Sequence, residues 1–204
     1  MEAYVANPEH VEILKQGVTV WNAWREEHPE ARPLLNEEDL SELNLSFANL
    51  RSANLSFANL TSTSLRRACL ESANLWHTRL HHADLSISDL SVALFQDAKL
   101  HQTRFHHALF SRTIFVDVDL STAQGLETVR HMAPSHIGID TIYHSQGNIS
   151  ERFLRGAGIP DPFITRHAIA PEAAQSAILS GVAARVCLVS RCCSHGIKGG
   201  SLSS

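Results

Sequence analysis

A leucine or phenylalanine recurs at every fifth position from residue 40 to residue 120, in seventeen consecutive repeats. On an α-helix, five residues turn the chain by about 500°, so these side chains would spiral over every face. On a straight β-strand, an odd spacing would place them alternately on opposite faces. Since neither regular element agrees with a period of five, the sequence predicts a chain that turns a corner once in each repeat.

Most repeats also carry Ala, Ser or Thr two places before the large residue, as in the segments SFANL, RSANL and HHADL. In an extended piece of three residues, the small residue and the leucine point to the same side, and the polar residue between them points away. Two residues then remain for the corner. If each corner turns the chain by about 90°, four repeats close one coil, and residue n stacks on residue n+20 about 4.8 Å away.

This register predicts which side chains fill the interior. All ten Gly and all seven Pro lie outside residues 34–124, so the segment is neither a loop nor a conventional series of turns. A helical array, the usual alternative for a repeated sequence, is excluded by the drift of the leucines around a helix. The residues expected to form the core are Leu50, Leu55, Leu60, Leu65, Leu70, Leu75, Leu80, Leu85, Leu90, Phe95, Leu100, Phe105, Phe110 and Phe115.

The repeats resemble those of the pentapeptide-repeat protein family, whose unit is written A-(D/N)-L-x-x. The resemblance implies an all-β solenoid, namely a right-handed quadrilateral β-helix. We therefore assign residues 35–124 to this β-helix. Glu38, Leu43 and Val118 replace the small inward residue, so irregular first and last coils are expected.

The segments on either side of the repeats predict caps, because a stacked coil leaves unpaired backbone at both ends. Over residues 1–34 we expect one capping α-helix, with Asn7 as its N-cap and Pro8 at its first position. Residues 125–168 predict short helices, with Ser135 and Ser150 as N-caps. Residues 169–204 predict a helix followed by a disordered tail.

Both flanking segments resemble those of bacterial pentapeptide-repeat proteins in which a linker leads into a TIR signalling domain. The opening NPEHVEILKQGVTVWNAWR and the stretch from residue 121 to Ile164 carry this resemblance. After Ile164 the resemblance ends, and the remaining forty residues are too few to form such a domain. No TIR domain, and no activity linked to one, is therefore expected.

Composition argues against several classes of protein. The formal net charge of −4 does not suit direct nucleic-acid binding, which requires a basic face. The N-terminus lacks the features of a signal peptide, and no apolar run is long enough to span a membrane. Four Cys, three of them near the C-terminus, do not form a disulfide framework. We expect a cytoplasmic protein with no contact to membranes.

No residue cluster predicts catalysis, a cofactor or a metal. The coil carries a histidine patch, but no Cys or carboxylate completes a zinc site, so a solvated, pH-sensitive face is favoured. Cys187, Cys192, Cys193 and His195 match no common zinc spacing. We find neither a phosphate loop nor a nucleophile motif, and a core filled with leucine leaves no pocket for a substrate. The patch consists of His77, His81, His82, His101, His106 and His107.

Two hypotheses for the function remain beside a TIR-linked regulatory role. Some relatives of this kind mimic duplex DNA and protect topoisomerases, which requires continuous ladders of acidic side chains. Residues 36–120 contain ten acidic and seven basic residues in mixed columns, so this hypothesis is the alternative. The favoured hypothesis is a non-catalytic scaffold that binds another protein.

One side of the coil supports the scaffold hypothesis, because its outward positions become apolar. These positions, the predicted partner-binding residues, are Phe57, Trp76, Leu94, Ile114 and Val116. A contiguous exposed apolar strip usually marks a contact surface. From the sequence, its occupant is the chain's own C-terminal segment, a second copy in a homodimer, or a foreign protein.

Overall fold

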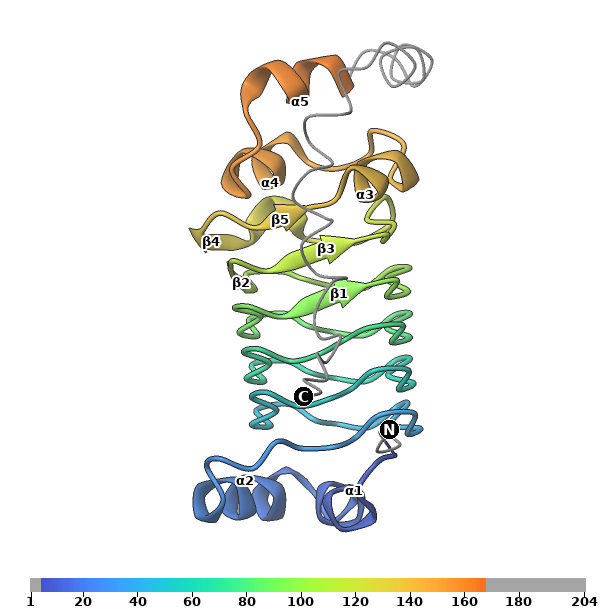
Figure 1. Ribbon diagram of the computed structural model, residues 1–204, viewed down its shortest axis with the longest axis vertical. Helices are drawn as coiled ribbons and strands as arrows, with labels where there is room; N and C mark the ends of the chain where they lie inside the picture. The colour runs from blue at the N-terminus through green and yellow to red at the C-terminus, as the bar shows by residue number, and fades with distance from the viewer. Residues whose placement is uncertain (1–4, 168–204) are drawn as a thin grey trace, which may run out of the picture. The chain divides into compact units, whose positions relative to one another are not determined.

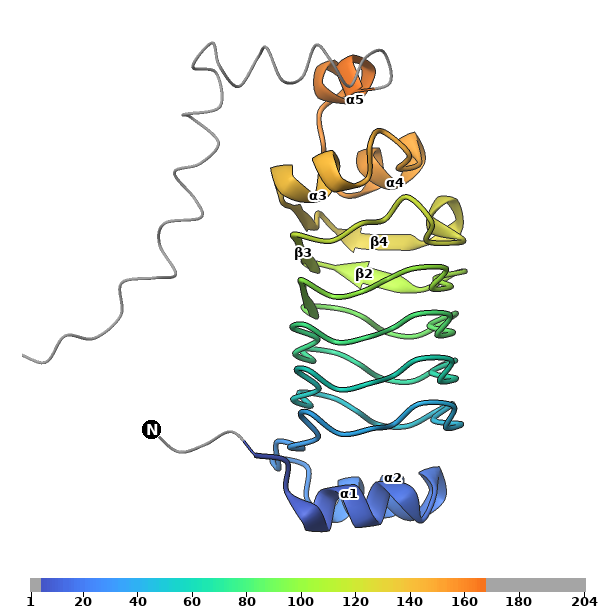
Figure 2. The same cartoon turned by 90° about the vertical axis from the view of Figure 1, so that its right-hand side faces the viewer.

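The fold is given by a computed structural model that describes residues 5–167, with side chains up to Ile164. Met1–Ile164 form one compact unit, whose centre is a stack of four-sided rungs (Figures 1 and 2). The predicted helix and tail over residues 169–204 lie outside the described residues, as do the three C-terminal cysteines. Cys69, in the coil, is a half-buried free thiol.

Parallel backbone pairing holds the rungs together. Bridges join residues twenty positions apart, from Leu34 with Asn54 to Arg104 with Gln124. Three segments are regular enough to form strands, β1 (Leu94–Gln96), β2 (Leu109–Ser111) and β3 (Ile114–Val116), and β1 pairs with β3 in the same register. Because corners recur every five residues and partners every twenty, each rung contains four repeats. The predicted register is confirmed, whereas the right-handed sense stays a prediction of the resemblance.

The corners place non-glycine residues in the left-handed region. The second residue after each large inward residue has φ between 51° and 67° at every corner from Glu37 to Asp117. Ile87 and Val92 do so although they are β-branched, for which this region is strongly unfavourable. At the corner of Phe57, the backbone N–H donates to the carbonyl of Trp76 on the next rung at 2.8 Å. Such inter-rung bonds offset a cost of about 1–2 kcal/mol per left-handed residue.

The interior is filled by the large inward side chains. All fourteen residues predicted for the core are at most 2% exposed. Towards the C-terminal end the column changes from leucine to phenylalanine, and the rings of Phe95 and Phe115 stack at 5.0 Å. Inward threonines are satisfied as well, since the Thr78 hydroxyl donates to the carbonyl of Leu55 on the rung below at 2.8 Å. The core therefore contains both apolar contacts and paired hydroxyls.

The outward Asn or Asp of the repeat has a structural role that its polarity alone does not indicate. The Asn59 side-chain oxygen accepts from the backbone N–H of Thr61 at 3.2 Å, and Asp84 accepts from Ser86 in the same way at 3.0 Å. Each such residue thus closes a local turn at the start of the corner. This contact explains why Asn and Asp recur at one outward position.

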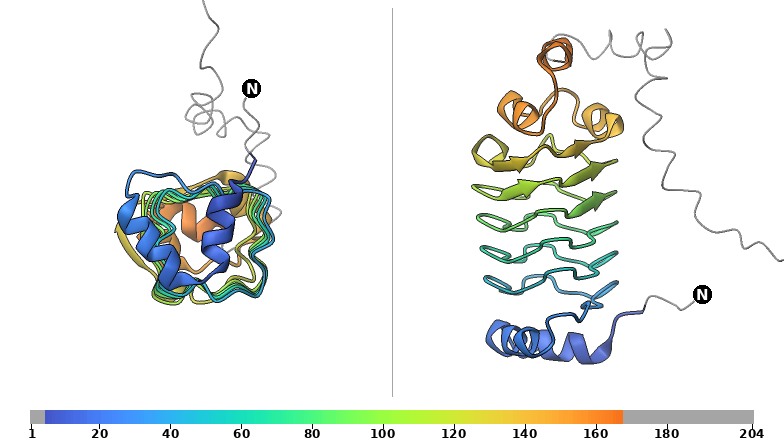
Figure 3. Two further views of the ribbon diagram at one scale, coloured as in Figure 1. Left: turned by 90° about the horizontal axis from the view of Figure 1, so that it is seen from below. Right: turned by 60° about the vertical axis from the view of Figure 1, so that its left-hand side comes forward.

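The N-terminal cap consists of two helices, α1 (Pro8–Lys15) and α2 (Val18–Glu27), so the prediction of one capping helix was wrong. Gly17 breaks the helix, with φ at 116°, a conformation that glycine adopts readily. Asn7 does act as the N-cap of α1, and its side chain accepts from the N–H of Glu9 at 2.9 Å. Seen along the coil axis, both helices lie across the end of the four-sided stack (Figure 3).

Side chains of α2 satisfy the open backbone edge of the first rung. The Trp21 indole N–H donates to the carbonyl of Asn49 at 2.8 Å, and Asn22 donates to the carbonyl of Phe47 at 3.0 Å. The Arg25 guanidinium, 3% exposed, donates to the carbonyls of Ala31 and Arg51. These donors replace the rung that is missing below, which keeps the edge from pairing with another chain.

Beyond the repeats the coil continues for part of another turn. Gly125 has φ at 79° and a Cβ there would lie 2.8 Å from the backbone nitrogen of His106, so only glycine fits. It adds one residue, and β4 (Arg130–Ala133) pairs with β2 one position out of register, as Leu109 with Arg130. Next follows β5 (His136–Ile137), which pairs with β3. The prediction that residues 125–168 contain only short helices was therefore wrong.

The helical elements of this segment are the 3₁₀ turn η1 (Leu126–Thr128), α3 (Ile139–His144), α4 (Glu151–Gly156) and α5 (Asp161–His167). Ser150 is the N-cap residue of α4, as expected. The expectation for Ser135 was wrong, because Gly138 stands at the start of α3 and Ser135 lies between β4 and β5.

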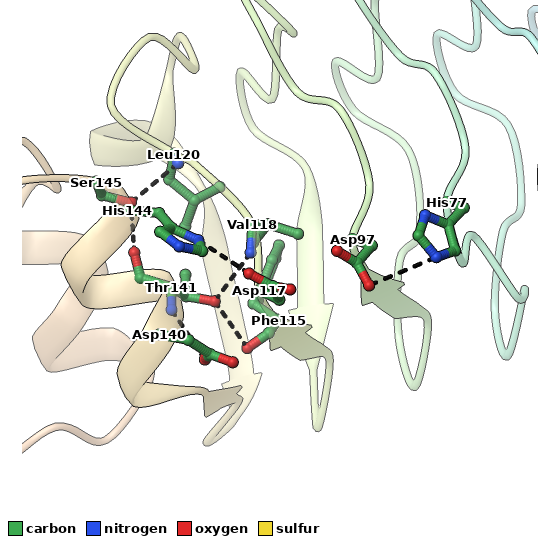
Figure 4. Close-up of polar contacts among 10 residues, drawn as sticks. All are labelled: His77, Asp97, Phe115, Asp117, Val118, Leu120, Asp140, Thr141, His144 and Ser145. Atoms are coloured by element: carbon green, nitrogen blue, oxygen red, sulfur yellow. Dashed lines mark hydrogen bonds and ion pairs between the residues drawn. The ribbon is translucent and has the colours of Figure 1, made fainter.

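Helix α3 covers the last rung with hydroxyl groups (Figure 4). Thr141 accepts from the N–H of Val118 at 3.4 Å and donates to the carbonyl of Phe115 at 3.3 Å. Ser145 accepts from the N–H of Leu120 at 3.0 Å. Both hydroxyls are buried, so they replace the backbone groups of a further rung.

A histidine ends one core column at the C-terminal cap. His131 follows Phe110 in the stack, and its ring lies 5.2 Å from that of Phe153. Both ring nitrogens are buried without a hydrogen-bond partner. Burial lowers the pKa of His131 below its ordinary value, so the folded protein favours the neutral ring.

The core register predicts the effect of a buried charge. Leu75→Lys places an ammonium group in a dry interior, so we expect loss of the folded coil, whereas Leu75→Ala should cost about 2–5 kcal/mol. Gln96→Lys, on the outside of the next rung, is the control and should melt like the unchanged protein. Circular dichroism during heating measures all three. An unchanged melting temperature for Leu75→Lys would refute the inward register.

The cap predicts a loss of stability in acid. Because the pKa of His131 is lowered in the folded state, the unfolded chain binds the additional proton. The contribution of His131 to stability is thus complete above about pH 6.5, the ordinary pKa of histidine. It falls as the pH drops towards the lowered pKa of the folded protein. His131→Leu should make the melting temperature less sensitive to pH between 5 and 7. The exposed His107→Asn is the control and should keep the original dependence. An equal dependence in His131→Leu would contradict the assignment.

Candidate interaction surface

The predicted partner-binding residues lie on one face of the coil, which we call the apolar face: Phe57, Trp76, Leu94, Ile114 and Val116. Strand pairing sets Leu94 beside Ile114 and Gln96 beside Val116. Leu94, Ile114 and Val116 are half-buried, while Phe57 and Trp76 are 46% and 37% exposed. Leu94 and Ile114 occupy the outward position that Asn54 and Asn74 hold on earlier rungs, so the face becomes more apolar towards the C-terminal end.

Three rings form an exposed aromatic group at one end of this face. Phe57 contacts Trp76 edge to face, with ring centroids 4.8 Å apart, and it stacks on His77 at 4.9 Å and 19°. Trp76 and His77 are in contact as well, at 5.0 Å. Rings packed in this way lose little further freedom on binding, which favours a rigid contact surface.

Two carboxylates border the apolar face along the adjoining corner. Asp97 lies 3.6 Å from His77 on the rung below, and Asp117 lies 3.0 Å from His144 of α3 (Figure 4). Both pairs are ionic only when the histidine carries a proton. While both rings are neutral, the border carries two negative charges that these rings do not neutralise.

Exposed apolar side chains elsewhere on the coil are more isolated. Phe47, 58% exposed, is partly covered by the Arg67 guanidinium, 5.5 Å from the ring centroid. Val92, 46% exposed, stands at the corner immediately before the apolar face and thus extends it past Leu94. Its place two residues before Leu94 is the sequence signal that assigns it to this face.

The six predicted patch histidines do not form a single cluster. His81, His82 and His101 form one group, in which the ring of His101 lies 6.2 Å from His81 and 5.7 Å from His82. His77 belongs to the apolar face, and His106 packs beside Gly125. Burial lowers the pKa of His81, and the positive charges of His101, His82, Arg79 and Lys99 lower it further. Among residues 5–164, no three His, Cys, Asp or Glu side chains are arranged to hold a metal ion.

Arginine side chains interrupt the columns of acidic residues on the coil. Asp84 lies between Arg66 and Arg104, at 3.3 and 3.6 Å, and Glu71 pairs with Arg51 at 3.0 Å. Burial alone would raise the pKa of Asp84, but hydrogen bonds from Ser86 and the charge of Arg66 outweigh this and lower it. Over the described part of the coil, these pairs break the acidic columns that DNA mimicry requires.

No helix within the described residues has the length and apolar character needed to cross a lipid bilayer.

Comparison with known proteins identifies the repeat. A family model described as pentapeptide repeats (8 copies) matches residues 39–76, 77–112 and 88–123. No curated protein is similar to the chain at a significant level.

Solved structures with similarity include a pentapeptide repeat protein from the thylakoid lumen of Arabidopsis thaliana, at 26% identity and a TM-score of 0.43 over 44% of this chain and 62% of that one. Rfr23 from the cyanobacterium Cyanothece 51142 is 24% identical, with a TM-score of 0.24 over 54% and 65% of the two chains. The plasmid-mediated fluoroquinolone resistance protein QnrB1 is 18% identical, with a TM-score of 0.27 over 53% and 57%. The chain thus spans less than two thirds of the length of each. Residues 39–123, which contain most of the twenty-residue rungs, thus match the model of the pentapeptide-repeat family.

Proposed function

We propose that this protein is a non-catalytic scaffold whose apolar face binds another protein. The observation that carries the proposal is the exposed aromatic group of Phe57, Trp76 and His77, continued by Leu94 and Ile114 on the rungs above. Within the described residues the core is closed by leucine and phenylalanine, so the available chemistry lies on the outside of the coil.

The surroundings of the apolar face define the chemistry of the partner. Asp97 and Asp117 stand on the border, where they complement lysine or arginine side chains. The partner is therefore a protein segment that presents apolar side chains to Trp76 and Leu94 and basic side chains to this border. Burying apolar surface contributes about 25 cal/mol per Å², less the cost of ordering the two surfaces.

Protection of a topoisomerase by DNA mimicry is the second candidate. It rests on the resemblance to pentapeptide-repeat proteins, some of which mimic duplex DNA, and the paired Asp84 and Glu71 argue against it. A regulatory role beside a TIR-type domain rests on the flanking segments alone. Neither candidate accounts for the apolar face.

Variants that differ in one exposed aromatic residue test the proposal. Phe57→Glu and Phe47→Glu both replace an exposed ring at a corner with positive φ, but only Phe57 lies on the apolar face. In affinity capture from native host cells, Phe57→Glu and Trp76→Glu should each lose a partner that the unchanged protein and Phe47→Glu retain. We expect each of these two substitutions to weaken the binding free energy of the partner by at least about 2 kcal/mol, as for a buried aromatic anchor at an interface.

Two further measurements, analytical ultracentrifugation and tryptophan fluorescence, identify other occupants of the apolar face. A dimer that Phe57→Glu dissociates would mean that a second copy covers it. A variant truncated after Ile164 that exposes Trp76, seen as a red shift in fluorescence, would mean that the chain's own C-terminal segment does. Capture that is unchanged in both Phe57→Glu and Trp76→Glu would refute the proposal.

A further inference from the structure

At one place on the coil, stacking brings two positive charges together. Stacking at n+20 normally brings opposite charges together, as with Arg51 and Glu71 at 3.0 Å. Arg66 and Arg104 likewise share Asp84. Arg79 and Lys99 are direct parallel neighbours in the same way, so two positive side chains start about 4.8 Å apart. Among the ion pairs of the described residues, neither has a partner within 4.0 Å.

Histidines extend this arrangement along the same two rungs. His81 and His101 follow Arg79 and Lys99 by two positions, with ring centroids 6.2 Å apart. Arg79, Lys99 and His101 are exposed, whereas His81 is half-buried. Burial lowers the pKa of His81, and the neighbouring positive charges of His101, Arg79 and Lys99 lower it further. Repulsion of this kind is relieved when an anion lies between the groups.

We propose that Arg79, His81, Lys99 and His101 form a binding site for a small, multiply charged oxyanion of the sulfate or phosphate class. Two neighbouring rungs present the donors on a rigid backbone, so little order is lost on binding. A surface depression of about 220 Å³ adjoins them and is lined by His81, Lys99, His101 and Thr122. The four side chains lie on the face next to the apolar face, and the depression shares Asp117 with the border of that face.

The remaining residues around the depression limit where the anion lies. Asp117, Asp119 and His144 line the depression as well, and Asp117 is paired with His144. The two carboxylates repel an anion, so it binds over the rung positions of Arg79 and Lys99. His82, also in contact with His101, adds a further positive charge in acid.

The site requires protonated histidines for full strength, so binding strengthens as the pH falls. Sulfate keeps the same charge between pH 6 and pH 8, which assigns any change in affinity to the protein. Inorganic pyrophosphate tests whether the phosphate class binds in the same way. Both are titrated at constant ionic strength, followed by calorimetry and by the imidazole resonances of His81 and His101.

We expect saturable binding at pH 6, weaker by about tenfold or more at pH 8, in line with the strength of a charge-assisted hydrogen bond. Arg79→Gln with Lys99→Gln should weaken binding at pH 6 by about tenfold or more. Arg112→Gln with Arg130→Gln removes the same charge from exposed positions elsewhere and should leave binding unchanged.

Three results would overturn the site: no saturable binding of either anion at pH 6, equal weakening in the Arg112/Arg130 control, or sulfate binding that is independent of pH. The resonances of His81 and His101 need no substitution. If they do not shift with sulfate in the unchanged protein, the site is refuted whatever the variants show.

Discussion

The structure depends on backbone hydrogen bonds between residues of neighbouring rungs. The N–H of Leu55 donates to the carbonyl of Asn74 at 2.9 Å, and the N–H of Asn74 donates to the carbonyl of Ala53 at 2.9 Å. This pairing fixes the register at twenty residues, and the register decides which side chains meet. It stacks Phe95 on Phe115 inside the coil, and it places Leu94 beside Ile114 and Arg79 beside Lys99 outside it. The core and both proposed binding surfaces thus follow from one repeated contact.

Such pairing leaves two open ends, and the chain closes them with different chemistry. At the N-terminal end, side chains of α2, among them Trp21 and Arg25, donate to first-rung carbonyls. At the C-terminal end, Thr141 and Ser145 satisfy the last rung, while His131 closes the core with a ring whose nitrogens are buried. Because both edges are covered by the chain itself, the sides of the coil remain as the surface for partners.

The rungs could be predicted from the sequence because a period of five residues is consistent with only one backbone geometry. It did not predict the positive φ of residues such as Ile87, since that conformation normally requires glycine and the repeats contain none. It also missed β4, because the extra residue at Gly125 ends the five-residue pattern although the pairing continues. The exposure of Phe57 and Trp76 followed from the register, whereas the contact of Phe57 with His77 depends on side-chain packing that a repeat pattern does not specify.

Disulfide mapping of the register tests the central claim most directly. In a background without the four native cysteines, Asn59→Cys with Arg79→Cys joins neighbouring rungs. Their Cα atoms should lie about 4.8 Å apart, within the range for a disulfide, whereas Asn59→Cys with Lys99→Cys spans two rungs, about 9.6 Å, beyond that range. We predict rapid oxidation of the 59/79 pair and none of the 59/99 pair, measured by mass spectrometry of the folded protein. Failure of the 59/79 pair to oxidise, or equal oxidation of both, would contradict a coil of twenty residues.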